Sequence, residues 1–174
     1  MYLSSGFLTV NSIVVGAIVY LRDENGRILL QRRRSGLFKG YVGLPGGKIE
    51  FGEDIVDAAL RELREETGLK GFRASASGVY SEVNFDNQST SNHFVLFVIR
   101  AGAYEGNLLE TTPEGQNFWM HEEDIDSLER VLPDLFFVLD AINRAPFVES
   151  LRRYNDGNQT YVVTSDGRRY PKQR

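Results

Sequence analysis

Three glutamates, Glu62, Glu65 and Glu66, stand at helical spacing within residues 54–67. At about 100° per residue they fall within an arc of roughly 100°, beside the apolar stripe of the same helix. Like charges at these spacings repel each other, and a divalent cation would relieve the repulsion. Magnesium is commonly held by carboxylates together with phosphate oxygens. The spacing therefore fits a metal site that accepts a phosphate, although for an arbitrary helix an acidic face that lies in water is the more common explanation.

The glutamates belong to the segment GKIEFGEDIVDAALRELREETGL, residues 47–69. This segment matches, at every defined position, the Nudix signature Gx5Ex7REUxEExGU, in which U is a bulky aliphatic residue. Seven fixed residues, each at roughly 6% of ordinary usage, coincide by chance in about one window in a billion. The chain thus resembles the Nudix hydrolases, in particular the MutT-like branch. The resemblance implies an α/β fold, an α/β/α sandwich with a mixed sheet and a loop-helix-loop catalytic motif.

The resemblance also implies which residues bind a metal ion and carry catalysis. In the family the corresponding glutamates bind Mg²⁺ or Mn²⁺, so Glu62, Glu65 and Glu66 are the expected ligands, with Gly46 beside them. Glu62 and Glu65 are expected to be catalytic, and Glu62 is a candidate general base. Glu114 lies in a loop where similar enzymes place a further metal-binding or proton-accepting glutamate. A turn glutamate in water is the alternative for Glu114.

Further residues are expected to support the catalytic glutamates or to contact the substrate. Arg61 and Glu53 resemble the family's structural pair, in which the arginine orients the glutamates. Glycines lack a Cβ atom and allow the backbone to approach a phosphate closely. The expected substrate contacts are Arg33, Gly46, Gly47 and Phe85. Arg33 could equally be a solvated strand-end arginine, and Phe85 could equally belong to the core.

Four other side chains are candidates for contacts with a nucleotide base. Tyr80 and Trp119 could stack on it, although aromatic residues in strands usually pack in the core. Asn84 and Asp134 could read base edges, or they could be turn and capping residues.

Hydrophobic periodicity predicts the elements that must position these residues. Residues 13–21 and 27–31 read as two strands joined by an Asn-Gly turn, and the glycine-rich residues 35–47 read as a loop with a short extended piece. A helix is predicted over residues 54–67, with Asp54 as its cap and Gly68 at its end. Extended patterns cover 72–85, 93–100 and 116–121, with a loop over 86–92. A second helix begins near Pro133.

Composition limits the remaining function classes. The chain has 174 residues, a net charge of −4, two histidines and no cysteine. Thiolate chemistry and cysteine-ligated metal centres are therefore excluded. The negative charge argues against binding to a DNA duplex, and the apolar run at 13–21 is too short to span a membrane. We expect a cytoplasmic protein without a membrane partner and with a small nucleotide as substrate.

The pattern weakens after Pro146. We therefore predict a Nudix domain over residues 1–146 and a basic C-terminal extension over residues 147–174. The extension holds six basic and three acidic residues and has turn signals at Asp156-Gly157 and Asp166-Gly167, which favour a hairpin. A homodimer is left open.

The preferred function is a Mg²⁺-dependent pyrophosphohydrolase that converts a nucleoside triphosphate, oxidised purine nucleotides included, to the monophosphate and pyrophosphate. An alternative is a pyrophosphatase for ADP-ribose or another nucleotide sugar. The residue about sixteen positions beyond the signature, where ADP-ribose hydrolases tend to carry proline, is Phe85, which leaves the triphosphate ahead. Removal of pyrophosphate from RNA 5′ ends would use the same site. An alternative of another class is a non-catalytic Nudix domain that senses nucleotides.

Overall fold

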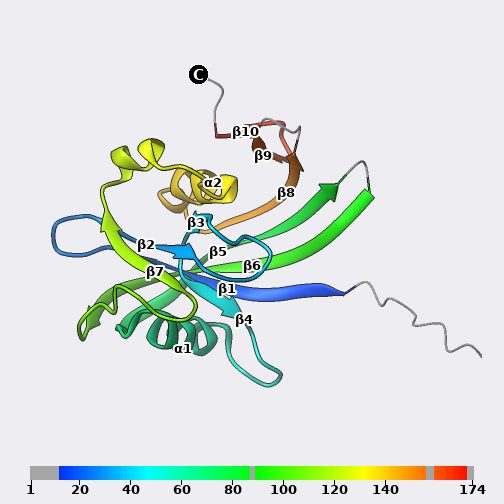
Figure 1. Ribbon diagram of the computed structural model, residues 1–174. Coiled ribbons are helices and arrows are strands. Elements are labelled where there is room, and N and C mark those ends of the chain that lie inside the picture. The colour runs from blue at the N-terminus through cyan, green and yellow to red at the C-terminus, as the bar shows by residue number, and fades with distance from the viewer. Residues whose placement is uncertain (1–11, 87–88, 156–158, 172–174) are drawn as a thin grey trace, which may run out of the picture.

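The computed structural model describes residues 12–86, 89–155 and 159–171 and contains two sheets between two helices (Figure 1). The larger sheet has seven strands, in the order β10 (Arg169–Tyr170), β9 (Thr160–Thr164), β8 (Phe147–Asn155), β5 (Lys70–Asp86), β6 (Ser89–Glu105), β1 (Ile13–Leu21) and β4 (Gly46–Lys48). The smaller sheet has the order β3 (Val42–Gly43), β2 (Ile28–Arg33) and β7 (Gly115–Met120). The helices are α1 (Ile55–Thr67) and α2 (Pro133–Ile142), with a short 3₁₀ helix, η1, at Glu122–Ser127.

The alternation of side chains along β1 explains the layers. Ile18 and Tyr20 point into the core that contains α2, whereas Ala17, Val19 and Leu21 point into the core that contains α1. A strand buried on both faces has no polar side, which is why this segment reads as a continuous apolar run. Strand β1 pairs parallel with β6 and antiparallel with β4. These observations confirm an α/β/α sandwich with a mixed sheet.

The turn between β1 and β2 forms as predicted, but the long hairpin does not. The Gly26 amide donates to the Asp23 carbonyl at 3.0 Å, and Gly26 has φ +77°. Beyond the bridge between Arg22 and Ile28 the two strands part, because β1 pairs with β6 and β4 while β2 pairs with β7 and β3. The hairpin prediction was wrong in this respect, since local turn chemistry does not reveal partners far away in the sequence.

Helix α1 has the ends that the sequence predicts. The Asp54 side chain accepts a hydrogen bond from the Val56 amide at 2.8 Å, and Gly68 ends the helix with φ +75°. Ala59 and Leu63 are fully buried against the sheet. The polar face of the helix is therefore fixed in orientation by its apolar face. No helix in the described ranges combines the length and the apolar character needed to cross a membrane.

Strands β5 and β6 are longer than the apolar pattern suggests. Residues 89–92 belong to β6 and not to the predicted loop, and Asn84 pairs with Asn92. Backbone pairing with β5 satisfies the amide and carbonyl groups of this segment, whatever its polar side chains prefer. Residues 87 and 88 lie outside the described residues.

The segment after Pro146 adds three strands to the larger sheet. Strand β8 pairs parallel with β5 and antiparallel with β9, and Leu151 and Val162 join the core under α2. The turn signal at Asp156-Gly157 lies outside the described residues. At the second signal, the Gly167 amide donates to the Thr164 carbonyl at 3.0 Å.

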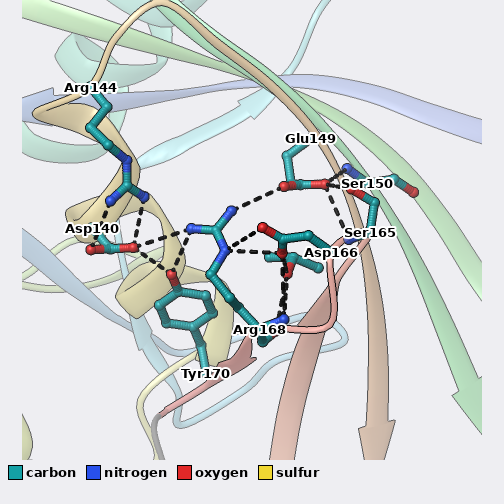
Figure 2. A network of polar contacts seen from close by, with 9 residues as sticks. Asp140, Arg144, Glu149, Ser150, Ser165, Asp166, Arg168 and Tyr170 are labelled. Carbon is teal, nitrogen blue, oxygen red and sulfur yellow. Dashed lines mark hydrogen bonds and ion pairs between the residues drawn. The ribbon is translucent and has the colours of Figure 1, made fainter.

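Polar contacts fasten the last strand to α2 (Figure 2). The Tyr170 hydroxyl donates to the Asp140 carboxylate, which also accepts from Arg144 at 2.8 Å. Arg168 lies 3.5 Å from Asp140 and 3.4 Å from Glu149 on β8. The division of the chain at residue 146 remains a prediction, and the stability of the whole sheet can test it.

We expect Leu151→Ala to lower the free energy of unfolding of the entire protein by about 2–5 kcal/mol, because it opens a cavity in the shared core. Val148→Ala on the same strand is the matched control; its side chain is 85% exposed, so the change should stay below about 1 kcal/mol. Urea unfolding followed by Trp119 fluorescence and by far-UV circular dichroism measures both. Two separate transitions, or no loss of stability in Leu151→Ala, would show that residues 147–174 fold apart from the rest.

Candidate active site

Strand β4 brings two glycines against the acidic face of α1. The Gly46 amide donates to the Glu66 carboxylate at 2.9 Å. A Cβ atom on Gly47 would lie 2.4 Å from the Glu62 carboxyl group, and one on Gly46 would lie 2.2 Å from the Ala17 carbonyl oxygen. Gly46 also has φ +147°, which L side chains rarely adopt. Gly47 therefore lets the strand approach Glu62, and Gly46 lets the same strand pair closely with β1 while its amide reaches Glu66.

One guanidinium holds three carboxylates of this region. Arg61 binds Glu53 with two hydrogen bonds, of 2.8 and 3.0 Å. Its Nη1 donates to Glu62 at 2.9 Å and to Glu65 at 3.2 Å. The hydrogen bonds from Arg61 hold the pKa of Glu53 below its usual value. Glu53 and Arg61 thus lie together as predicted, and Arg61 fixes the orientation of Glu62.

Glu66 differs from the other glutamates because it is buried. Burial raises the pKa of Glu66 to about 7, and the charges of Glu62 and Glu114 act in the same direction. The Gly46 hydrogen bond and the charge of Arg33 oppose this shift. An uncompensated buried carboxylate favours its protonated form, so a cation beside Glu66 would favour the ionised form.

A cavity of about 190 Å³ opens beside the glycines. Gly46, Gly47, Lys48 and Arg33 line it together with apolar side chains from the larger sheet, from α2 and from the segments between elements. The Nε atom of Arg33 is buried and has no hydrogen-bond partner. A donor of this kind beside backbone glycines suits a phosphate oxygen.

The glutamates have the chemistry of a magnesium site but not its arrangement. Within residues 12–86, 89–155 and 159–171, no three carboxylate or histidine side chains are grouped so that they could hold a metal ion. Glu66 turns to Gly46, whereas Glu62 and Glu65 turn to Arg61, and the Glu65 side chain is 60% exposed. The donor oxygens fit a hard cation. Such a cation would have to compete with Arg61 for Glu62 and Glu65.

The other predicted site residues lie at different distances from this centre. Glu114, exposed before β7, is close enough for its charge to act on Glu66. Phe85 stacks on Tyr154 with ring centroids 5.6 Å apart and lines a second cavity of about 270 Å³, which shares Phe38 and Arg153 with the first. Its substrate contact stays a prediction. Trp119 packs on Tyr104 against the core of α1.

Sequence reasoning missed two buried charged residues that line the cavity, Glu82 and Arg153. Tyr80, Glu82 and Asn84 alternate along β5 and are all buried. Period-two alternation with Tyr80 could have placed Glu82 on the inner face, where a charge requires a partner. Arg153 likewise lies two positions after the buried Leu151 and therefore on the same face of its strand. However, the pairing of β5 with β8 is not visible in the sequence.

The NUDIX domain family model matches residues 13–139. Among curated relatives, the uncharacterized Nudix hydrolase YvcI of Bacillus subtilis is 32% identical over 108 residues, which are 62% of this chain and 66% of that protein. The ADP-ribose pyrophosphatase of Methanocaldococcus jannaschii is 42% identical over 79 residues, 44% of this chain and 47% of that protein. A putative 8-oxo-dGTP diphosphatase of Bacillus subtilis is 36% identical over 73 residues, 42% of this chain and 47% of that protein.

Among solved structures, a MutT protein from Bacillus halodurans superposes with a TM-score of 0.68 at 25% identity, covering 90% of this chain and 99% of that one. The three curated relatives named above are matched over 66%, 47% and 47% of their lengths. This chain therefore spans between about half and about two thirds of each of them.

The raised pKa of Glu66 predicts how stability depends on pH in the metal-free protein. The folded state keeps a proton that the unfolded chain loses above about pH 4.5, so the stability that Glu66 contributes is complete below pH 4.5 and is lost as the pH rises through 7. Relative to Glu66→Gln, the wild type should lose roughly 3 kcal/mol between pH 4.5 and 8. Urea unfolding in chelator at several pH values measures the difference. A constant difference would show that Glu66 titrates as an ordinary surface glutamate.

Proposed function

The chain belongs to the Nudix family, and we propose from this that it hydrolyses a phosphoanhydride bond in a nucleoside diphosphate linked to another group. One observation carries the proposal: the carboxylates of Glu62 and Glu66 lie against Gly47 and Gly46, and these two glycines also line a cavity. In this arrangement, acidic groups that can accept a proton adjoin a backbone that can approach a phosphate.

The residues of the site divide the work in the proposed reaction. Water attacks phosphorus, its proton passes to a carboxylate for which Glu62 is the candidate, and the bond to the leaving phosphate breaks. Arg61 and Glu53 position Glu62 and Glu65. Arg33, with its unpartnered Nε atom, and Lys48 neutralise phosphate oxygens in the cavity.

Glu62, Glu65, Glu66 and Glu114, with the backbone of Gly46, would hold Mg²⁺ or Mn²⁺ when it binds. Such an ion supplies charge neutralisation and a more acidic water. The raised pKa of Glu66 supports this, because a carboxylate that ionises reluctantly lacks a compensating charge.

The preferred substrate is a nucleoside triphosphate, oxidised purine nucleotides included, with the monophosphate and pyrophosphate as products. A relative named as a putative 8-oxo-dGTP diphosphatase and the likeness to a MutT structure support this choice. A relative named ADP-ribose pyrophosphatase supports the alternative of a nucleotide sugar. Retention of Glu53, Glu62, Glu65 and Glu66 argues against a silent nucleotide sensor. RNA 5′ ends, a cytoplasmic location and a homodimer stay predictions.

A screen of nucleoside triphosphates, 8-oxo-dGTP, ADP-ribose, nucleotide sugars and triphosphorylated RNA, with Mg²⁺ and with Mn²⁺, tests the function. Hydrolysis in water enriched in oxygen-18 identifies the attacked phosphorus. We expect nucleoside monophosphate and pyrophosphate from a triphosphate. ADP-ribose as the preferred substrate would favour the alternative, and binding without turnover would favour the sensor.

We expect Glu62→Gln and Glu65→Gln each to lower kcat by about 10²-fold or more while the thermal unfolding temperature stays near that of the wild type. Glu105→Gln is the matched control, because Glu105 is an exposed glutamate that pairs with Lys70 at 3.0 Å. Normal turnover in both site variants would contradict the assignment of the site.

A further inference from the structure

A buried charged network reaches the same cavity from the C-terminal strands. Arg153 on β8 binds Glu82 on β5 with two hydrogen bonds, of 2.8 and 2.9 Å, and Asp134 on α2 with one of 2.6 Å. The Tyr80 hydroxyl donates to the second oxygen of Asp134 at 2.7 Å. All four residues are at least nine-tenths buried, and Arg153 is only 5% exposed. Buried charges are costly unless they are paired, so this network is held in a fixed geometry.

The network leaves one strong donor without a partner. The Nη1 atom of Arg153 is buried and makes no hydrogen bond. The guanidinium carbon lies 4.9 Å from the centroid of the Phe38 ring. Arg153, Glu82, Asp134 and Phe38 all line the cavity that Gly46 and Gly47 also line. Leaving a charged donor unpaired costs more than an ordinary hydrogen bond contributes, and the side chain that carries this donor lines the cavity, so the geometry points to a ligand that completes it.

The charge of the network indicates which part of a nucleotide it suits. Two carboxylates and one guanidinium sum to −1 when ionised, and burial together with the charge of Asp134 raises the pKa of Glu82 to about 7. Neither protonation state is positive, so the network does not attract a phosphate. Arg33 and Lys48 line the same cavity and carry positive charge. The cavity wall is otherwise largely apolar, with Leu132 and Val138 among its residues. A neutral, planar, polar-edged group fits beside the network.

We propose that Arg153 is a specificity-determining residue that selects a nucleobase with a carbonyl oxygen on its reading edge. Its Nη1 atom would donate to that oxygen, while Glu82 or Asp134, each with a free lone pair, would accept from the adjacent ring N–H group. A base of the hypoxanthine or guanine type presents this pattern, whereas adenine presents an amino group where Arg153 needs an acceptor. This inference rests on the proposed function, because it names the base of that substrate. Arg153 lies beyond the residues 13–139 that match the family model.

The test compares ITP with ATP, whose bases differ at position 6, where hypoxanthine has a carbonyl group and adenine an amino group. Wild-type kcat/KM should be about tenfold or more higher for ITP than for ATP, mainly through KM, with GTP close to ITP. In Arg153→Lys, which keeps a positive charge between the carboxylates but loses the planar fork, the ratio should fall to about threefold or less. Arg168→Lys in the same segment is the control and should keep the wild-type ratio.

Calorimetric measurement of IMP and AMP binding tests the base preference separately from the proposed hydrolase function. Absence of turnover with every nucleotide, together with tighter binding of IMP than AMP, would refute the hydrolase function and leave the base preference standing. Equal or reversed preference in the wild type overturns the role of Arg153. If Arg153→Lys lowers turnover of ITP and ATP by the same factor, Arg153 supports the fold alone. The wild-type comparison keeps the proposal falsifiable even if the variant does not fold.

Discussion

Acidic side chains crowded on one helix face require a compensating charge, and in this protein Arg61 provides it. The guanidinium contacts Glu62 and Glu65, which lie on the same helix as Arg61, and Glu53, which lies in the loop before that helix. Its position depends on the apolar face of α1, because burial of Ala59 and Leu63 fixes the rotation of the helix. Glu66 is beyond the reach of Arg61 and is left with a backbone amide. The uneven distribution of positive charge makes Glu66 the carboxylate that gains most from a cation.

The site depends equally on the absence of side chains at two positions of β4. Two consecutive residues without Cβ atoms allow the strand to pair with β1 and at the same time to touch the acidic face of α1. Because β4 pairs with β1, the larger sheet fixes the position of β4 and hence of the carboxylates that β4 contacts. Strand β1 also separates the two cores, so the site and the cavity beside it are both built on β1.

Local sequence patterns predicted what depends on local interactions. Capping by Asp54, the end of α1 at Gly68, Pro133 at the start of α2 and the contact between Arg61 and Glu53 all follow from short spacings or from the family signature. The partners of β2, the extension of β6 to Ser89 and the burial of Arg153 depend on pairing between distant strands. Nothing in the segment around Arg153 indicates that it meets Glu82, 71 positions earlier. The resemblance predicted that Arg61 orients the glutamates, but it did not specify that Arg61 donates hydrogen bonds to both Glu62 and Glu65.

The strand order of the larger sheet has a consequence for association with other chains. Its outermost strands, β10 and β4, are only two and three residues long. A long exposed edge is a template for pairing with a foreign strand, and very short edge strands are one way in which natural proteins avoid it. Strands β5 and β6, with 17 residues each, lie in the interior of the sheet, where residues 78–84 of β5 and 93–101 of β6 are paired on both sides. The two short edge strands should therefore disfavour fibrillar aggregation through the edges of the larger sheet.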